Sequence, residues 1–233
     1  MYLYELHAHT LPCSGGGGEM EKHIDELIRR GFSGMVITNH FYRGDTKIDR
    51  SLPWEEFVSF YEKDFEDGKK YAKNKDFDLL FGVEEHISDG REALIYGITP
   101  AFLKENPSLK TVNLQEYASL VHSVGGVIYQ AHPYRVRGYI TKPQPFDEIA
   151  ILDGIEVYNG GNDREENDKA EAFAALRGLP MIAGSDAHDS RHCGIGGICS
   201  NVRIRDNETL VKVLKTGAYT LWKDEERRKE RRG

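Results

Sequence analysis

Short β-rich runs alternate with helical stretches along most of the sequence, and this alternation limits the fold more than any other feature. Repeated strand–helix units are typical of a parallel sheet covered by helices, and about seven such units favour a sheet that closes into a barrel. We predict strands at 2–6, 35–38, 78–83, 93–98, 127–130, 155–158 and 181–183, with a further candidate at 202–204. The predicted helices are 19–30, 53–74, 113–124, 164–177 and 207–215.

The sequence has no linker that would divide it. We predict one α/β barrel domain over residues 1–222 and a charged C-terminal tail over residues 223–233. The closing DEERRKERRG has no apolar face, which predicts a frayed helix end or a disordered tail. Its arginines would suit a nucleic-acid-binding arm, but Asp224, Glu225, Glu226 and Glu230 dilute their charge.

The overall charge and the cysteines restrict the partners and the compartment. A formal net charge of −7 disfavours general binding to nucleic acid. Cys13, Cys193 and Cys199 have no regular spacing, so we interpret them as packing residues rather than disulfides or soft metal ligands, and predict a reducing, cytoplasmic location. The opening MYLYELHAHT lacks signal-peptide character, and no apolar run approaches the roughly 18 residues of a membrane helix.

Residues of the types that bind metal ions follow the predicted strands directly. They come from five different strands and are His7, His9, His40, Glu84, His132, Asp186 and His188. In a β/α barrel the catalytic residues lie at the C-terminal ends of the strands. The sequence therefore predicts a cluster of metal ligands at one end of the barrel.

The spacing of these residues fits metal chemistry. Side chains alternate along an extended chain, so His7 and His9 point to the same side and would chelate one ion. Asp186 and His188 repeat that spacing. Imidazole nitrogens and carboxylate oxygens suit Zn, Mn and Fe. Glu84 would bridge two ions, and metals about 3.5–4 Å apart would hold a shared hydroxide and both oxygens of a phosphoryl transfer.

Other residues of these types have simpler interpretations. His23 and His122 lie inside predicted helices and are interpreted as packing or surface residues. His86, two residues after Glu84, would either support a ligand or serve packing. The glycines at 15–18 resemble a phosphate-binding loop but lack the Lys-Ser/Thr that follows such loops, so we interpret them as a lid or a linker.

Five motifs resemble those of the polymerase and histidinol phosphatase (PHP) domain family. They are ELHAHT at 5–10, ITNH at 37–40, GVE at 82–84, AHP at 131–133 and GSDAH at 184–188, in the family order. The resemblance covers nearly the whole chain and implies a distorted (β/α)7 barrel, two or three divalent ions (Zn, Mn or Fe) and phosphoester hydrolysis. It implies three ligand sets: His7, His9, Glu84 and Asp186, with Glu84 bridging; His132 for a second ion; His40 and His188 for a third.

The sequence departs from the family pattern at three places. Asn39 stands where the family usually has Asp, which removes a charge but keeps a hydrogen-bonding group. Glu92 stands where the family often has a histidine, and it is a candidate ligand. The family often places Asp or His shortly after His-Thr, whereas here Glu19 is the nearest acid and a further candidate.

These features predict a hydrolase that cleaves a phosphate monoester of a small metabolite through a metal-bridged hydroxide. Arg135, Arg191 and His192 are the candidates for binding the substrate phosphate, with surface ion pairs as the alternative for the arginines. Asp186 or His188 would pass a proton to the leaving oxygen, and the sequence does not choose between them.

Three residues of the predicted sixth strand are further candidates for the pocket. Tyr158 and Asn159 end this strand and would line the pocket. Glu156 points the same way as Tyr158, or it packs inside the barrel instead.

Three other functions are compatible with parts of the pattern. A 3′–5′ exonuclease or phosphodiesterase would use the same chemistry, although an acidic chain disfavours a polymeric nucleic acid. Asn39 and Glu92 leave open a non-catalytic metal-binding regulatory module, which would hold one ion tightly without turnover. Metal-dependent amide hydrolysis on a related barrel is disfavoured because no lysine ends a predicted strand.

Overall fold

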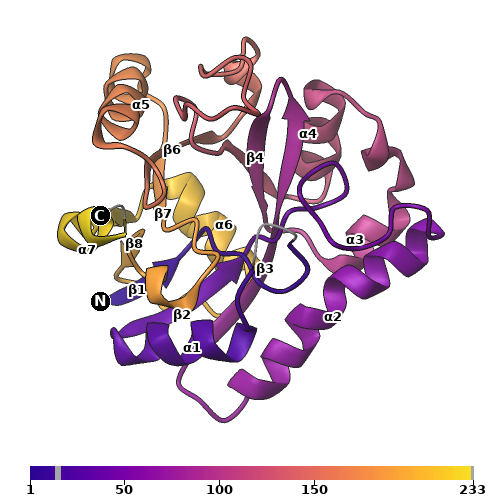
Figure 1. Ribbon diagram of the computed structural model, residues 1–233, viewed down its shortest axis with the longest axis horizontal. Coiled ribbons are helices and arrows are strands. Elements are labelled where there is room, and N and C mark those ends of the chain that lie inside the picture. Colours follow the sequence, from indigo (N-terminus) through magenta and orange to yellow (C-terminus); the bar gives the residue numbers. More distant parts are fainter. Residues whose placement is uncertain (14–16, 232–233) are drawn as a thin grey trace.

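The computed structural model describes residues 1–13 and 17–231, and the strands in these ranges form one sheet that curves into a nearly closed barrel (Figure 1). The strands are β1 (Tyr2–Glu5), β2 (Phe32–Ile37), β3 (Asp78–Ser88), β4 (Arg91–Tyr96), β5 (Val127–Gln130), β6 (Gly154–Asn159), β7 (Met181–Gly184), β8 (Gly196–Ser200) and β9 (Tyr219–Lys223). The α-helices are α1 (Met20–Arg29), α2 (Trp54–Ala72), α3 (Pro100–Glu105), α4 (Leu114–Ser123), α5 (Arg164–Arg177), α6 (Asn207–Thr216) and α7 (Glu225–Glu230). Residues 15 and 16 of the predicted lid or linker at 15–18 fall outside the described residues.

The predicted α/β barrel is confirmed, but its sheet is mixed rather than parallel. The order is β7-β6-β5-β4-β3-β2-β1-β8-β9, and β4 runs antiparallel to both β3 and β5. Asp89 (φ 57°) and Gly90 (φ 79°) both take left-handed backbone angles, which a tight hairpin turn requires, so β3 and β4 form a hairpin. The predicted strand at 202–204 is wrong, because β8 and β9 add the last strands on either side of it.

Within the described residues, the first and seventh strands of the barrel meet by a backbone bridge at its C-terminal end. Strand β8 pairs antiparallel with β1 at its start, and so occupies the edge that β7 would need. Beyond the end of β1, Ala8 pairs with Ala187, and the His9 amide donates to the Ala187 carbonyl at 2.8 Å. This bridge joins the first and seventh strands next to the predicted ligands, and it makes the barrel a distorted one.

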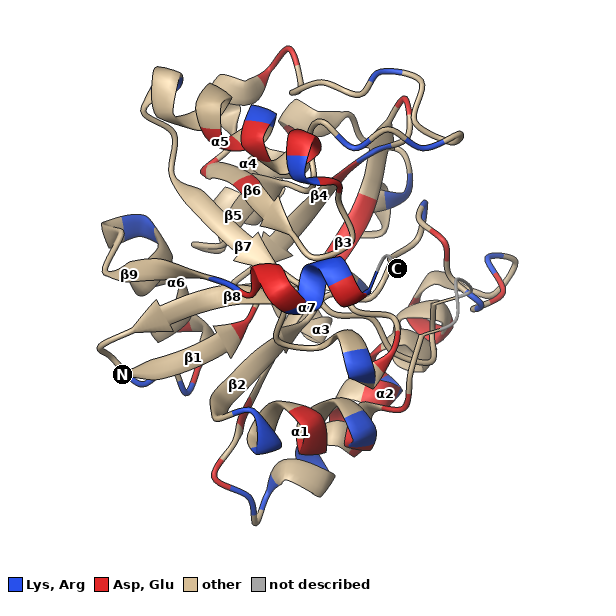
Figure 2. Cartoon of the chain, turned by 60° about the vertical axis from the view of Figure 1, so that its left-hand side comes forward, with Lys and Arg blue, Asp and Glu red and all other residues tan. Residues whose placement is uncertain are grey.

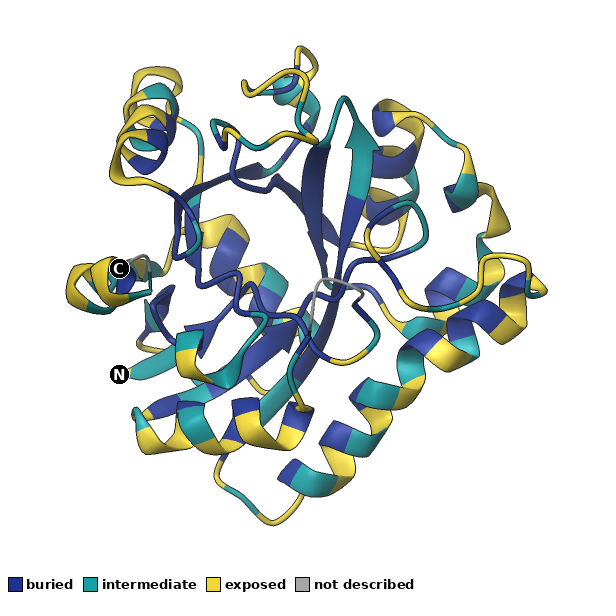
Figure 3. Cartoon of the chain, in the orientation of Figure 1, coloured by how far each residue is buried: buried dark blue, intermediate teal, exposed yellow. Residues whose placement is uncertain are grey.

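Alternation along the strands divides the core into two main layers. Met35 and Ile37 of β2 face outward and pack with α1 and α2, whereas Val36 faces the barrel interior. Leu210 and Leu214 of α6 pack into the interior cluster, and α6 lies behind the ring of strands in Figure 1. The strands are therefore mostly buried, and the helices expose their outer faces (Figure 3).

Residues 225–230 of the predicted tail form the helix α7, where the sequence left a frayed helix end or a disordered tail as alternatives. Asp224 caps α7 through the Arg227 amide at 3.1 Å, and it also accepts from Arg30 of the α1 end at 2.8 Å. Charges of both signs lie along α7 (Figure 2). The charged side chains of this segment bind polar groups of the barrel, and these contacts take the place of an apolar face.

Among the described residues, none of the helices combines the length and the apolar character needed to cross a membrane.

Candidate metal centre

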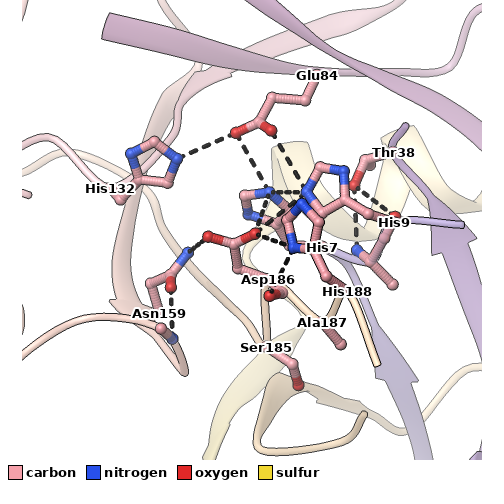
Figure 4. A network of polar contacts seen from close by, with 12 residues as sticks. His7, His9, Thr38, Glu84, His132, Asn159, Ser185, Asp186, Ala187 and His188 are labelled. Carbon is pink, nitrogen blue, oxygen red and sulfur yellow. Dashed lines mark hydrogen bonds and ion pairs between the residues drawn. The ribbon is translucent and has the colours of Figure 1, made fainter. Parts of the chain in front are cut away.

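The seven predicted ligands lie together at the C-terminal ends of the strands, and Glu92 of β4 joins them (Figure 4 draws most of them). Within the described ranges, four groups have donor atoms that all lie within 4.8 Å of one another. They are His7, Glu84 and His132; His7, His9 and Asp186; His9, His40 and His188; and His40, Glu84 and Glu92. The groups share members, as expected for a multinuclear centre.

The His-x-His spacing has the predicted effect. His7 and His9 leave β1 with both rings on the same side, and their Nε2 atoms are 3.0 Å apart. His7 Nε2 lies 3.2 Å from Glu84 Oε1, and His9 Nε2 lies 3.2 Å from Asp186 Oδ1. Two nitrogens and two carboxylate oxygens therefore converge on one point.

Glu84 lies at the centre of the cluster. Its Oε1 is 3.1 Å from His132 Nε2, and its Oε2 is 2.9 Å from His40 Nδ1. The geometry at His40 Nδ1 and Glu84 Oε2 is not that of a hydrogen bond, so both atoms are buried without a hydrogen-bond partner. Such orphaned atoms, in a set of imidazoles and carboxylates, fit divalent Zn, Mn or Fe.

The pKa values of the cluster residues are shifted in opposite directions. Burial alone would lower the pKa of His40, but the Glu84 carboxylate raises it to about 9. Burial and then Glu84 raise the pKa of Glu92 to about 8. Burial would raise the pKa of Asp186, yet Arg135 and His7 hold it well below its usual range. Protons on His40 and Glu92 thus occupy positions that cations would take, a pattern typical of functional sites.

Two cluster residues have left-handed backbone angles. His132 has φ 27° and Asp186 has φ 51°, which L-residues other than glycine rarely adopt. Strain of this kind costs on the order of 1–3 kcal/mol and collects at functional sites. It places both side chains toward the cluster at the point where their strands have ended.

Residues around the cluster orient the candidate ligands. Glu156 of β6 points into the barrel, where its Oε1 lies 2.9 Å from His7 Nδ1 and its Oε2 accepts from the His132 amide at 3.1 Å. A register shift between Glu156 and Tyr158 turns Tyr158 away, to pack with Ala183 and Ile195. Glu156 therefore packs inside the barrel, the second of its two predicted alternatives, and does so in contact with the site.

Asn39, one of the three departures from the pattern of the resembled family, binds the chain beside the site. Its Oδ1 accepts from the Thr10 amide at 2.6 Å, and its Nδ2 donates to Thr10 Oγ1 at 2.8 Å. Cys13 is a free thiol whose Sγ accepts from the His40 amide at 3.2 Å. The retained hydrogen-bonding group thus fixes the chain just after His9.

A cavity of about 530 Å³ opens over the cluster. Four cluster residues contribute to its lining: His40, Glu92, Asp186 and His188. Arg135 also lines it and is nearly buried, with its Nη2 2.5 Å from Asp186 Oδ2 and 2.7 Å from Asn159 Oδ1. Of the three predicted phosphate-binding residues, Arg135 alone lies at this cavity.

The rest of the cavity lining includes residues that sequence reasoning missed. They are Arg43, Asp45 and Tyr139, which lie on loops. His86 of β3, for which support of a ligand and packing were the alternatives, lines the cavity as well. His86 accepts from the Gly90 amide at 3.1 Å, so it stabilises the hairpin turn beside the cavity. The loops at 41–53 and 134–146 follow β2 and β5, and they carry no motif that marks these three side chains.

The structure places three predicted site residues away from the cavity. The side chain of Arg191 is 80% exposed and pairs with Asp189 at 2.8 Å. His192 lies beside it in the 3₁₀ helix Ser190–His192 (η3), which turns both away from the cavity. Glu19 is exposed and pairs with Lys22 at 3.0 Å. These three predictions are therefore corrected: Arg191 and His192 lie in a 3₁₀ turn outside the cavity, and Glu19 stands at the exposed start of α1.

The helical histidines agree with their interpretation. His122 is exposed and lies 2.8 Å from Asp153 Oδ2. His23 is fully buried against two backbone carbonyls, those of Glu19 at 3.1 Å and Ala187 at 3.4 Å. His23 thus packs α1 against the loop that carries Asp186.

Comparison with known proteins agrees with this architecture. A family model described as PHP-associated matches residues 164–219. A two-domain protein from Bacteroides vulgatus, containing a predicted PHP-like metal-dependent phosphoesterase, superposes with a TM-score of 0.71 at 15% identity over 95% of this chain and 64% of that one. The chain thus spans under two thirds of that protein. No curated protein matches the sequence.

Two further solved structures share the fold. An amidohydrolase from Chromobacterium violaceum, with bound sulfate and no metal, has a TM-score of 0.56 at 18% identity over 79% of this chain and 87% of that one. The lesion-specific endonuclease EndoQ from Pyrococcus furiosus has a TM-score of 0.63 at 13% identity over 94% of this chain and 57% of that one.

The barrel and the donor cluster at its C-terminal end define a class, that of β/α-barrel proteins with a candidate multinuclear metal centre. The five motifs, the family model over residues 164–219 and the solved structures then agree in one likeness: the chain is similar to proteins of the PHP domain family and shares their fold.

Proposed function

We propose that this protein is a metal-dependent phosphoesterase that hydrolyses a phosphate monoester of a small metabolite. The observation that carries the proposal is the eight-residue donor cluster beneath a cavity that Arg135 also lines. Two or three divalent ions held there would supply Lewis acidity toward a phosphoryl oxygen and lower the pKa of an attacking water.

The cavity supports a small substrate. Its volume of about 530 Å³ lies within the range of small-molecule sites. Arg135 would bind the phosphoryl group, because a guanidinium matches phosphate geometry and this one is already fixed by Asp186, Asn159 and Asn162. The sulfate bound to the Chromobacterium violaceum protein supports recognition of a tetrahedral anion on this fold.

The two predicted proton donors differ in their contacts and in their exposure. Asp186 is held as a carboxylate by Arg135, so it would deliver a proton only by breaking a buried ion pair. His188 lines the cavity and its side chain is 28% exposed, so it is the better placed of the two. We assign the proton transfer to His188.

One comparison favours a second candidate, a nuclease or phosphodiesterase. The Pyrococcus furiosus endonuclease shares the fold. Against it stands the net charge of −7, because a polymeric nucleic acid is bound mainly through cationic contacts to its phosphates. The three cysteines are free thiols, which supports a cytoplasmic location for either enzyme.

The test is a metal analysis paired with a substrate screen. Chelator-treated protein is reconstituted with Zn²⁺, Mn²⁺ or Fe²⁺ and assayed on p-nitrophenyl phosphate, a panel of phosphorylated metabolites, bis-p-nitrophenyl phosphate and single-stranded DNA. We expect turnover of monoesters that depends on added metal. Faster turnover of the diester or the DNA would favour the nuclease. One tightly held ion with no turnover of any ester would identify a regulatory module and overturn the proposal.

A further inference from the structure

The last described residue, Arg231, contacts the backbone of the loop that carries Asp186. Its Nη1 donates to the Ser185 carbonyl at 2.6 Å, and its Nη2 donates to the Asp186 carbonyl at 2.9 Å. One planar guanidinium thus binds two consecutive carbonyls, the arrangement to which its fixed fork of donors is suited. Sequence composition alone treats this arginine as part of a solvated charge run.

The loop needs such support because its conformation is unfavourable by itself. Asp186 takes the left-handed backbone angle φ 51°, and the carbonyls on both sides of its Cα are the ones that Arg231 binds. On the N-terminal side, Glu5 accepts from the Ser185 amide at 2.9 Å. Glu5 and Arg231 therefore bind this backbone through different groups. Glu5 accepts a hydrogen bond from an N–H, and Arg231 donates hydrogen bonds to two carbonyls.

The position of the Asp186 carboxylate depends on this backbone. Asp186 Oδ1 lies 3.2 Å from His9 Nε2, and Oδ2 lies 2.5 Å from Arg135 Nη2. A change in the Asp186 peptide angles would swing the carboxylate away from both. The C-terminal segment thus bears on the donor cluster although no atom of it is a candidate ligand.

Helix α7 is itself fixed to the barrel, so Arg231 is presented by a rigid element. Arg30 binds Asp224 at 2.8 Å before the helix. Within it, Arg228 donates to the Asn162 carbonyl at 3.2 Å, and Asn162 Oδ1 accepts from Arg135 Nε at 2.8 Å. Two arginines therefore link the helix to the Arg135–Asp186 pair. Arg228 contacts Asn162, which binds Arg135, and Arg231 binds the Asp186 carbonyl.

We propose that Arg231 is a positioning residue for the metal centre, acting through Asp186. It holds the Ser185–Asp186 backbone in the angle that directs the carboxylate at the ions. The proposal rests on the proposed metal centre, but not on the reaction or the substrate. Removing such a supporting contact typically weakens metal binding by about 10- to 100-fold.

The experiment measures metal affinity in a double-mutant cycle. Dissociation constants for Zn²⁺ and Mn²⁺ are obtained by chelator competition for the wild type, Arg231→Ala, Asp186→Ala and the double variant. We expect Arg231→Ala to weaken binding by about tenfold or more in the wild-type background and to have no further effect when Asp186 is already alanine. Equal affinity in Arg231→Ala and the wild type, or an equal loss in both backgrounds, would overturn the proposal.

Matched variants separate positioning from general destabilisation. Lys229→Ala removes an exposed cation from the same helix and should leave affinity unchanged. Arg231→Lys, which offers one ammonium in place of the fork, should lie between the wild type and Arg231→Ala, and it serves if the alanine variant fails to fold. Co²⁺ absorption spectra should change shape in Arg231→Ala but not in Lys229→Ala; identical spectra would count against a positioning role.

The cycle also separates this proposal from the proposed function. A wild-type protein that binds no divalent ion would overturn the metal centre and the phosphoesterase together. A wild type that binds ions and turns over esters, with an Arg231→Ala variant that binds them equally well, would overturn only the role of Arg231.

Discussion

His7 Nδ1 lies 2.9 Å from Glu156 Oε1, and both side chains are fully buried. A hydrogen on Nδ1 that donates to this carboxylate leaves the Nε2 lone pair directed at Glu84 and the rest of the cluster. Carboxylates behind metal-binding histidines fix the ring in this way and raise its basicity. The contact joins the end of β1 to β6 across the barrel interior, so the histidine is oriented before any ion arrives.

Removing one donor from the group of His7, His9 and Asp186 should lower the metal content of the protein. We expect His7→Ala and Asp186→Ala to lower metal content by at least one ion per chain and to lower monoester turnover by about 100-fold or more. Elemental analysis of protein purified in excess Zn²⁺ or Mn²⁺ measures the first quantity. His122→Ala, which removes an exposed histidine paired with Asp153, is the control. Unchanged metal content in both donor variants would refute the centre.

Replacing Arg135 should change the kinetic constants strongly, and replacing Arg191 should leave them nearly unchanged. Arg135→Gln loses a nearly buried cation that lines the cavity, and we expect a rise in KM and a fall in kcat/KM of about 100-fold, or about 3 kcal/mol. Arg191→Ala removes an exposed pair with Asp189 and should change neither by more than about twofold. Steady-state kinetics on one monoester measures both. The reverse result would restore the sequence prediction for Arg191.

Glu92 should influence which metal is preferred. It adds a third carboxylate to a cluster of five histidines, 3.5 Å from both His40 and His132. Carboxylate oxygen suits Mn²⁺ better than imidazole does. We therefore expect Glu92→His to shift the ratio of Zn²⁺ to Mn²⁺ affinity toward Zn²⁺ by about tenfold, or about 1.4 kcal/mol. Competition binding of the two ions tests this, and an unchanged ratio would exclude Glu92 as a ligand.

A buried acid behind the cluster should make stability depend on pH. Burial raises the pKa of Glu85 from 4.5 to about 7, although Arg43 opposes the rise. The folded state therefore binds more protons than the unfolded chain between these values, and this contribution to stability is lost as pH rises through 7.

Replacing Glu85 should remove that dependence. The stability of Glu85→Gln relative to the wild type should rise by about 3 kcal/mol between pH 4 and pH 8, measured by urea unfolding of metal-free protein. Glu55→Gln, at an exposed position on α2, should show no such trend. A difference between Glu85→Gln and the wild type that stays constant with pH would contradict the assignment.

The sequence predicted the parts of the site that depend on strand periodicity. His7, His9 and Glu84 could be placed because a side chain at the end of a short apolar strand has only two directions available. Arg191 and His192 could not, because their direction depends on a 3₁₀ turn that Asp189 caps. Loop conformation follows from such local hydrogen bonds, which leave little periodic trace.

The same reasoning explains the errors in the fold. Asp89 and Gly90 form the turn of the β3–β4 hairpin, and a signal of two residues is easily overlooked between two apolar strands. Helix α7 has no apolar stripe and is held by arginines that bind carbonyls distant in the sequence. Contacts between polar groups far apart in the chain leave no pattern in hydrophobicity, so composition suggested a tail.

The bridge between Ala8 and Ala187 has a thermodynamic consequence. Each of these alanines stands between two candidate donors, so an ion bound there would hold together the ends of the first and seventh strands at this bridge. Part of the free energy of metal binding would then contribute to the free energy of folding. Without ions the barrel would open first at this bridge, and the His9 amide, which donates to Ala187, would exchange its hydrogen sooner than the amides of the central strands.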